Sequence, residues 1–241
     1  MLELNKAYNM DCMEGMREFP DGFFDLAVVD PPYGGAGQEF KRSDKSRFGG
    51  KFDRYKRDNP VDSAGGGYSV GRTGGTWASK YGKKIISWDY APGEEYFKEL
   101  FRVSKNQIIW GGNYFNLPPN RCFLIWRKTN IPEKFSMAMV EYAWCSMNDN
   151  AKLYECSSST GNRFHPTQKP VDLYAWIYAN YAEEGYKILD THLGSGSSRI
   201  AAWESEKRLE FIGFEIDTDY FEKQEKRFKQ ECSQMNLFHL L

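Results

Sequence analysis

The sequence lacks any uninterrupted apolar stretch of about eighteen residues, the length that a membrane-spanning helix needs. Its first residues, MLELNKAYNMD, also lack the apolar run of a signal peptide. The five cysteines form no CxxC pair, so neither a disulfide framework nor a zinc site is indicated. These absences predict a cytoplasmic protein with no membrane partner and no metal.

The composition is that of a folded chain with one unusual segment. Hydrophobic residues make up 41% and aromatic residues 16% of the 241 residues, which excludes disorder throughout. Residues 34–84 contain twelve Lys or Arg against five Asp or Glu, twelve of the 22 glycines, and no Leu or Ile. We therefore predict a single domain over 1–241 with a mobile basic insertion at about 34–84. A grip on a phosphate backbone and a solvated loop without a partner both fit its composition.

Outside that segment, short apolar runs alternate with helical spacings. Strands are predicted at 24–30, 107–110, 122–126, 142–146, 187–190 and 211–216. Helices are predicted at 94–103, from Pro170 as a first helical residue towards Gly185, at 196–204 and at 217–232. Strands that alternate with helices imply an α/β fold, with a mostly parallel sheet covered by helices on both faces.

The first candidate site, Asp30-Pro31-Pro32-Tyr33, follows the apolar run FDLAVV. The Asp30 carboxylate and the Pro31 carbonyl can accept the two hydrogens of an exocyclic amine, whose lone pair is otherwise delocalised into its ring. The two prolines stiffen the turn and remove N–H donors, and Tyr33 offers a face for a stacked ring. The alternative interpretation is an ordinary proline-rich turn.

The second candidate site is a strand, a glycine turn and a helix start, ILDTHLGSGS at 188–197. Its glycines allow close approach to a ligand, and the helix start offers free N–H groups. Arg199 stands where a dinucleotide motif has its third glycine, and Glu215 lies where an acid can hold a ribose diol. A nucleoside cofactor without a pyrophosphate suits this pattern better than NAD, although Asp190 and Glu215 could be plain polar strand ends.

Four motifs in order resemble those of the DNA amino-methyltransferases that use S-adenosylmethionine, in the arrangement of the β group. They are DPPY at 30–33, HPTQKP at 165–170, DTHLGSGS at 190–197 and FEID at 214–217. The resemblance implies a three-layer, Rossmann-like α/β fold with a mostly parallel seven-stranded sheet. It assigns catalysis to Asp30, Pro31, Pro32 and Tyr33.

The same resemblance implies a set of cofactor-binding residues. Asp11 is expected near the adenine, Glu215 at the ribose, and Lys169 on the opposite side of the cofactor. The methionine end is expected to lie against Asp190, Leu193, Gly194, Ser195, Gly196 and Ser197. His192 stands where the family usually has phenylalanine, and it is expected to pack on the cofactor without acting in the chemistry.

The function that the resemblance implies is site-specific methylation of double-stranded DNA, of the kind found in restriction-modification. A base flipped out of the duplex would receive the methyl group on its exocyclic amine. Aspartate at the first motif position favours adenine N6 over cytosine N4. Methylation of RNA or of a protein glutamine, a non-enzymatic nucleic-acid-binding module, a nicotinamide dehydrogenase and a homodimeric assembly stay open.

Overall fold

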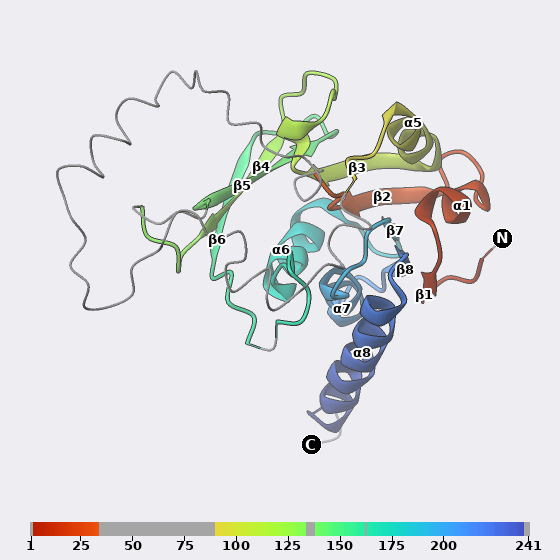
Figure 1. Ribbon diagram of the computed structural model, residues 1–241, viewed down its shortest axis with the longest axis vertical. Coiled ribbons are helices and arrows are strands. Elements are labelled where there is room, and N and C mark those ends of the chain that lie inside the picture. Colours follow the sequence, from red (N-terminus) through yellow and green to blue (C-terminus); the bar gives the residue numbers. More distant parts are fainter. Residues whose placement is uncertain (1, 34–89, 134–137, 162, 239–241) are drawn as a thin grey trace, which may run out of the picture. The chain divides into compact units, whose positions relative to one another are not determined.

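The computed structural model describes residues 2–33, 90–133, 138–161 and 163–238 (Figure 1). The chain divides into one unit of Met1–Tyr33 with Ala91–Leu241 and a second of Gly34–Tyr90. The fold below is that of the first unit, and the mobile insertion predicted at about 34–84 lies outside the described residues. Within the described ranges, every helix is too short or too polar to cross a lipid bilayer.

The described part of the chain forms one sheet of eight strands in the order β1-β8-β7-β2-β3-β5-β4-β6. The first five strands of this order run parallel: β1 (Lys6–Asn9), β8 (Glu210–Glu215), β7 (Lys187–Asp190), β2 (Phe24–Val29) and β3 (Ser104–Trp110). The antiparallel strand β5 (Val140–Cys145) joins them to β4 (Phe123–Lys128) and β6 (Lys152–Cys156). The mostly parallel α/β fold is confirmed, with β6 as an edge strand beyond the expected seven.

Helices cover both faces of the sheet (Figure 1). On one face lie α1 (Cys12–Arg17) and α5 (Glu94–Val103), and on the other α6 (Val171–Tyr181) and α7 (Ser197–Glu204). The long helix α8 (Thr218–Phe238) packs against α7, β1 and β8. Strand β2 shows why two cores form, because its alternate residues belong to different ones: Leu26 and Val28 face α6 and α7, whereas Ala27 and Val29 face α1 and α5.

Most expected elements are present, with differences at their ends. Helix α5 spans the predicted residues 94–103. Pro170, expected as a first helical residue, is instead the N-cap of α6, with φ −65° and ψ 149°. A proline fixes φ and leaves ψ free, so it can end an extended turn as well as begin a helix. The short elements β1, α1 and β6 were not predicted.

The packing of α1 on the sheet depends on the absence of a side chain at Gly15. A Cβ atom built there would lie 2.3 Å from the ring of Phe214 on β8. Phe214 is fully buried, so the ring has no solvent space into which it could turn. Helix α1 therefore approaches β8 at the distance of bare backbone.

We expect Gly15→Ala to lower the free energy of unfolding by about 1–3 kcal/mol, since overpacking outweighs alanine's better helix propensity. Gly93→Ala is the matched control, because a Cβ atom at Gly93 would meet nothing within 4 Å. Because Gly93 is the N-cap of α5, where alanine is a poor cap, that control should lose only about 0.5–1 kcal/mol. Urea unfolding measures both, and equal stabilities of the two variants would contradict the close packing of α1.

Candidate active site

The candidate site lies at the carboxyl ends of the parallel strands, where the chain leaves two neighbouring strands in opposite directions. Strand β2 leads through α5 to β3 on one side, and β7 leads through α7 to β8 on the other. Because α5 and α7 cover opposite faces, their connections diverge at the β2–β7 pair. Ligands of open α/β sheets bind at such a switch point. Asp30 directly follows β2, and Asp190 ends β7.

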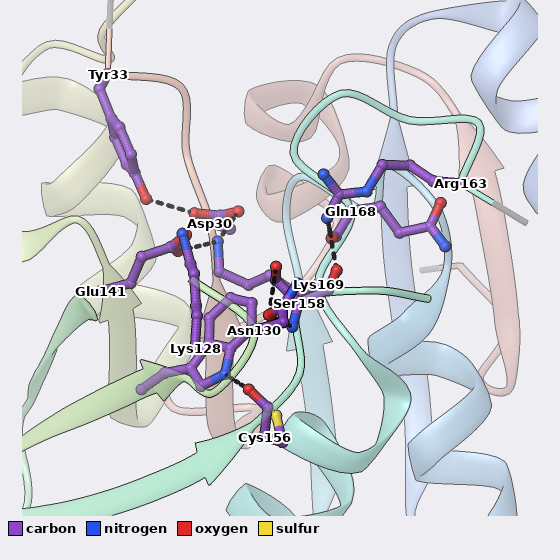
Figure 2. A network of polar contacts seen from close by, with 11 residues as sticks. Asp30, Tyr33, Lys128, Asn130, Glu141, Cys156, Ser158, Arg163, Gln168 and Lys169 are labelled. Atoms are coloured by element: carbon purple, nitrogen blue, oxygen red, sulfur yellow. Dashed lines mark hydrogen bonds and ion pairs between the residues drawn. The ribbon is translucent and has the colours of Figure 1, made fainter. Parts of the chain in front are cut away.

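Asp30 is held on both of its carboxylate oxygens (Figure 2). Its Oδ1 accepts a hydrogen bond from the Tyr33 hydroxyl at 2.8 Å, and its Oδ2 pairs with the Lys169 ammonium. The side chains of Asp30 and Lys169 are only 13% and 4% exposed. A charge buried this deeply needs a partner, because an uncompensated one is strongly destabilising. Lys169 is thus the counter-charge of the predicted catalytic carboxylate.

The pair of Asp30 and Lys169 belongs to a row of four charged side chains, Asp30, Lys169, Glu141 and Lys128 (Figure 2). The Lys169 Nζ lies 3.1 Å from Glu141 Oε2, and Glu141 Oε1 lies 2.6 Å from the Nζ of Lys128. Burial alone would raise the pKa of Glu141, but the two ammonium groups lower it to about 2. Burial likewise opposes the charge on Lys169, yet Asp30 and Glu141 hold its pKa above the usual value. Glu141 and Lys169 are therefore both charged at neutral pH.

Tyr33 is packed against the turn that follows β3. Its ring stacks on that of Tyr114, with centroids 4.7 Å apart and an interplanar angle of 24°. A Cβ atom at Gly111 would lie 2.1 Å from the Tyr33 ring, and Gly111 has a φ of +67°. Only glycine meets both demands. Pro31 is buried and Pro32 half-buried between Asp30 and this ring.

Glu215 links the end of β8 to the glycine turn that follows β7. Its Oε2 accepts the N–H of Gly194 at 2.7 Å, and its Oε1 accepts the N–H of Asp217 at 2.9 Å. Burial raises the pKa of Glu215 to about 7, outweighing the effect of both hydrogen bonds. A carboxylate oxygen has more than one lone pair, so both oxygens can accept a further hydrogen from a diol.

Asp190 braces the glycine turn from inside. It is 2% exposed, its Oδ1 accepts the N–H of His192 at 3.0 Å, and its Oδ2 accepts the hydroxyl of Ser198. Burial raises its pKa to about 6. Gly194 and Gly196 have φ values of +54° and +76°, which lets the turn present backbone where side chains would intrude.

The remaining turn residues face inward. The Leu193 side chain belongs to the core under α7, and the hydroxyls of Ser195 and Ser197 are 3.2 Å apart. Arg227 on α8 donates to the Ser195 carbonyl at 3.1 Å and to the Ser197 hydroxyl at 2.9 Å. The buried ring of His165 lies beside the turn, 3.2 Å from where a Cβ atom at Gly194 would be. Residues 193–197 are all buried, and the N–H groups of Leu193, Gly194 and Gly196 donate within the protein.

Asp11 follows β1 and His192 follows β7, so both lie at the carboxyl edge of the parallel strands. Asp11 caps α1, accepting the N–H of Met13 at 2.7 Å. The ring of His192 packs edge-on against Tyr96 of α5 with centroids 5.4 Å apart, and its Nδ1 lies 2.9 Å from the Thr191 hydroxyl. Burial lowers the pKa of His192 to about 4, although Asp11 opposes the shift, so the ring is neutral at pH 7.

The predicted residues therefore form two adjoining groups. Asp30–Tyr33 make one, and the ends of β1, β7 and β8 make the other. Lys169, predicted on the cofactor side, lies in the first group. The sequence reasoning missed Glu141, Lys128, Tyr96, Gly111 and Tyr114, which no motif marks. The described ranges hold no group of three or more His, Cys, Asp or Glu placed to bind a metal ion.

Comparison with solved structures identifies the fold class as that of DNA methyltransferases. The PvuII DNA methyltransferase, specific for cytosine N4, is similar with a TM-score of 0.57 and 14% identity, over 92% of this chain and 86% of that one. The M1.HpyAVI–SAM complex is similar with a TM-score of 0.54 and 16% identity, over 92% and 98%. Identities this low establish the fold alone.

Sequence comparison identifies the family. A model of the N6/N4 DNA methylases matches residues 76–226, more than half of the chain. The chain belongs to this DNA methylase family, which confirms the resemblance stated from the sequence. The type II methyltransferase M2.MboI of Moraxella bovis is 26% identical over 250 residues, covering 92% of this chain and 87% of that protein. The putative methylase YubD of Escherichia coli K12 is 35% identical over 68 residues, 28% of this chain and 29% of that one.

We expect the affinity for S-adenosylmethionine to rise with pH through about 7, because Glu215 then loses its proton and accepts from a ribose diol as a full carboxylate. Glu215→Gln should remove this rise and weaken binding at pH 8 by about 1.5–3 kcal/mol. A smaller rise near pH 6, where Asp190 titrates, should persist in the variant. Calorimetry at several pH values measures both proteins, and identical pH profiles would exclude Glu215 from the cofactor site.

Proposed function

We propose that the protein is a site-specific DNA methyltransferase that moves a methyl group from S-adenosylmethionine to N6 of an adenine flipped out of the duplex. One observation carries the proposal. The Asp30 carboxylate is fixed through Oδ2 by Lys169, with Oδ1 beside the motif's own Tyr33, at the switch point next to the glycine turn. An exocyclic amine needs such a placed acceptor.

The residues on the other side of the switch point fit the cofactor. Glu215 would hold the ribose hydroxyls, Asp11 would lie near the adenine, and the backbone of 193–197 would line the methionine end. The glycine turn supports this, because the positive φ of Gly194 and Gly196 bends the backbone beside Glu215, which accepts the N–H of Gly194. When bound, S-adenosylmethionine supplies a methyl group that its sulfonium has already activated. The fold's similarity to M1.HpyAVI, solved as a complex with that cofactor, also supports the assignment.

The chain's own part in the reaction is to hold and polarise the amine. Asp30 Oδ1 would accept one amine hydrogen and the Pro31 carbonyl the other. The nitrogen lone pair leaves the ring's π system as the nitrogen becomes tetrahedral, which makes both hydrogen bonds stronger. Since they strengthen towards the transition state, they accelerate transfer and do more than tighten binding.

Tyr33 would supply the platform for the flipped base. Taking a base out of the duplex costs a few kcal/mol, and stacking on an aromatic ring returns about 1–3 kcal/mol. In the structure one face of Tyr33 meets Tyr114, and its hydroxyl occupies Asp30 Oδ1. An amine would therefore either share that oxygen with the Tyr33 hydroxyl or displace it, since a carboxylate oxygen accepts more than one hydrogen bond.

Adenine is the proposed base because the first motif position is aspartate. The PvuII enzyme shows that a similar fold serves cytosine N4 in that protein. Cytosine is accordingly an outcome that the product analysis below distinguishes. Flipping of the base out of the duplex is likewise part of the proposal.

The proposal includes the basic segment 34–84 as a contact to DNA phosphates, on the strength of its local charge of +7. Replacing four of its Lys or Arg by Gln should reduce the dependence of DNA affinity on salt, because fewer counterions are released on binding. Affinity for S-adenosylmethionine should not change. DNA titrations at several salt concentrations test this, and an unaltered salt slope would remove the segment from the interface.

The central test is Asp30→Ala in an assay of labelled methyl transfer to duplex DNA, with the methylated base identified by mass spectrometry. We expect transfer to fall by about two orders of magnitude or more, with DNA binding retained, because the lost contact is strongest in the transition state. Asp25→Ala is the matched control. It lies at the other end of β2 and pairs with Lys105 at 2.6 Å. The control should lose stability and keep its activity.

Two outcomes would contradict the proposal. Wild-type rates in Asp30→Ala would show that this carboxylate does not activate the amine. N4-methylcytosine as the sole product would replace adenine by cytosine and leave the catalytic assignment standing.

A further inference from the structure

We infer that Lys169 is a positioning residue that aims the Asp30 carboxylate at the target amine, and that Glu141 and Lys128 hold its ammonium in place. The inference rests on the proposed function of Asp30, and it explains why the site would accept an amine and reject a carbonyl oxygen. Lys169 touches no reacting atom in this scheme, because it acts through Asp30 Oδ2 (Figure 2).

The surroundings of Lys169 give its ammonium three partners. An ammonium has three N–H donors and no acceptor. Lys169 Nζ meets Asp30 on one side and Glu141 on another, and it lies 5.3 Å from the ring centroid of Trp110, a distance typical of cation–π contact. A fourth partner, such as a cofactor carboxylate, would have to displace one of these.

The rear of the row is anchored in the sheet. Glu141 is the second residue of β5, and Lys128 is the last residue of β4. The two strands pair antiparallel, with Arg127 opposite Val140. The N–H of Lys128 also donates to the Met139 carbonyl at 2.8 Å. Rigid strands thus fix the ammonium of a side chain that is otherwise flexible. Asp30 is aimed by the β4–β5 pair as much as by its own strand.

The arrangement selects the chemistry of the substrate. With Oδ2 paired to the Lys169 ammonium, the other oxygen of the Asp30 carboxylate, Oδ1, can only accept hydrogen bonds. The amines of adenine and cytosine donate to it. The carbonyl oxygens of thymine and guanine, at the corresponding ring edges, would place lone pair against lone pair in a buried site. The row therefore specifies an amine donor, beyond the shape of the base.

The test compares Lys169→Met with the wild type at saturating DNA and cofactor. We expect kcat to fall about 100-fold, as misplaced catalytic groups do, while calorimetry gives unchanged affinity for S-adenosylmethionine. Lys207→Met is the matched control. Lys207 is a partly buried lysine whose Nζ bonds three carbonyl oxygens at the end of α6, those of Tyr178, Ala179 and Ala182. It should lose stability and keep its kcat.

Chemical rescue separates positioning from structure. In Lys169→Ala, added propylammonium should restore part of the lost kcat, because it returns a cation to the space between Asp30 and Glu141. Sodium chloride at the same ionic strength should not. A lysine needed only for packing gives no such difference.

Lys169→Met leaves Asp30 without its partner, so a second variant protects the test against misfolding. Lys169→Gln removes the cation but keeps amide N–H donors for the two buried carboxylates. Cofactor binding reports that it folds, and its kcat should also lie far below that of the wild type.

Each result decides the matter. Wild-type kcat in either folded variant would overturn the inference, and so would weakened cofactor binding with kcat unchanged, which would return Lys169 to the cofactor site. A wild-type protein that transfers no methyl to DNA would instead overturn the proposed function, and this inference with it.

Discussion

A charge at the end of a strand buried on both faces is the constraint on which the site depends. Strand β2 is apolar on both sides, and Asp30 follows it with 13% of its side chain exposed. Such a carboxylate requires a cation, Lys169 supplies it, and a lysine that is 4% exposed in turn requires Glu141. Glu141 then pairs with Lys128. Segments far apart in the sequence are thereby joined by one alternating row of charges. Removing one member of an ion pair lowers the free energy of unfolding more than removing both members, because a single removal leaves an unpaired buried charge.

Strand order places the two groups of candidate site residues side by side along one edge of the sheet. Strands β8 and β7 end at Glu215 and Asp190, and Asp11 follows two residues after the end of β1. The neighbouring strands β2 and β3 lead to Asp30 and Gly111. A ligand spread along this edge would have its nucleoside at one end and its reactive end at the β2–β7 boundary. The order of the motifs along the chain does not matter for this, because parallel pairing alone places their strands side by side.

The sequence was sufficient where a local pattern decides the structure. Helix α5 spans its predicted residues because its apolar spacing is strong, and both candidate sites follow apolar runs that form strands. It was insufficient where partners distant in sequence decide. The HPTQKP motif contains Lys169 but does not say which way its side chain turns. That depends on the register of β4 against β5. The position of His192 likewise depends on Tyr96, nearly a hundred residues earlier. Strand β6 is a half-exposed edge whose pattern is too weak to read alone.

The closed arrangement of Tyr33 has a consequence for turnover. Its hydroxyl donates to Asp30 Oδ1 and its ring stacks on Tyr114. Under the proposed function, a flipped base would make contacts of the same kind, a hydrogen bond to Oδ1 and a ring stack. Binding the base would then exchange contacts more than add them, and the net gain in affinity would be small. The Tyr33 hydroxyl would compete for Oδ1 again after transfer, which would favour release of the modified base.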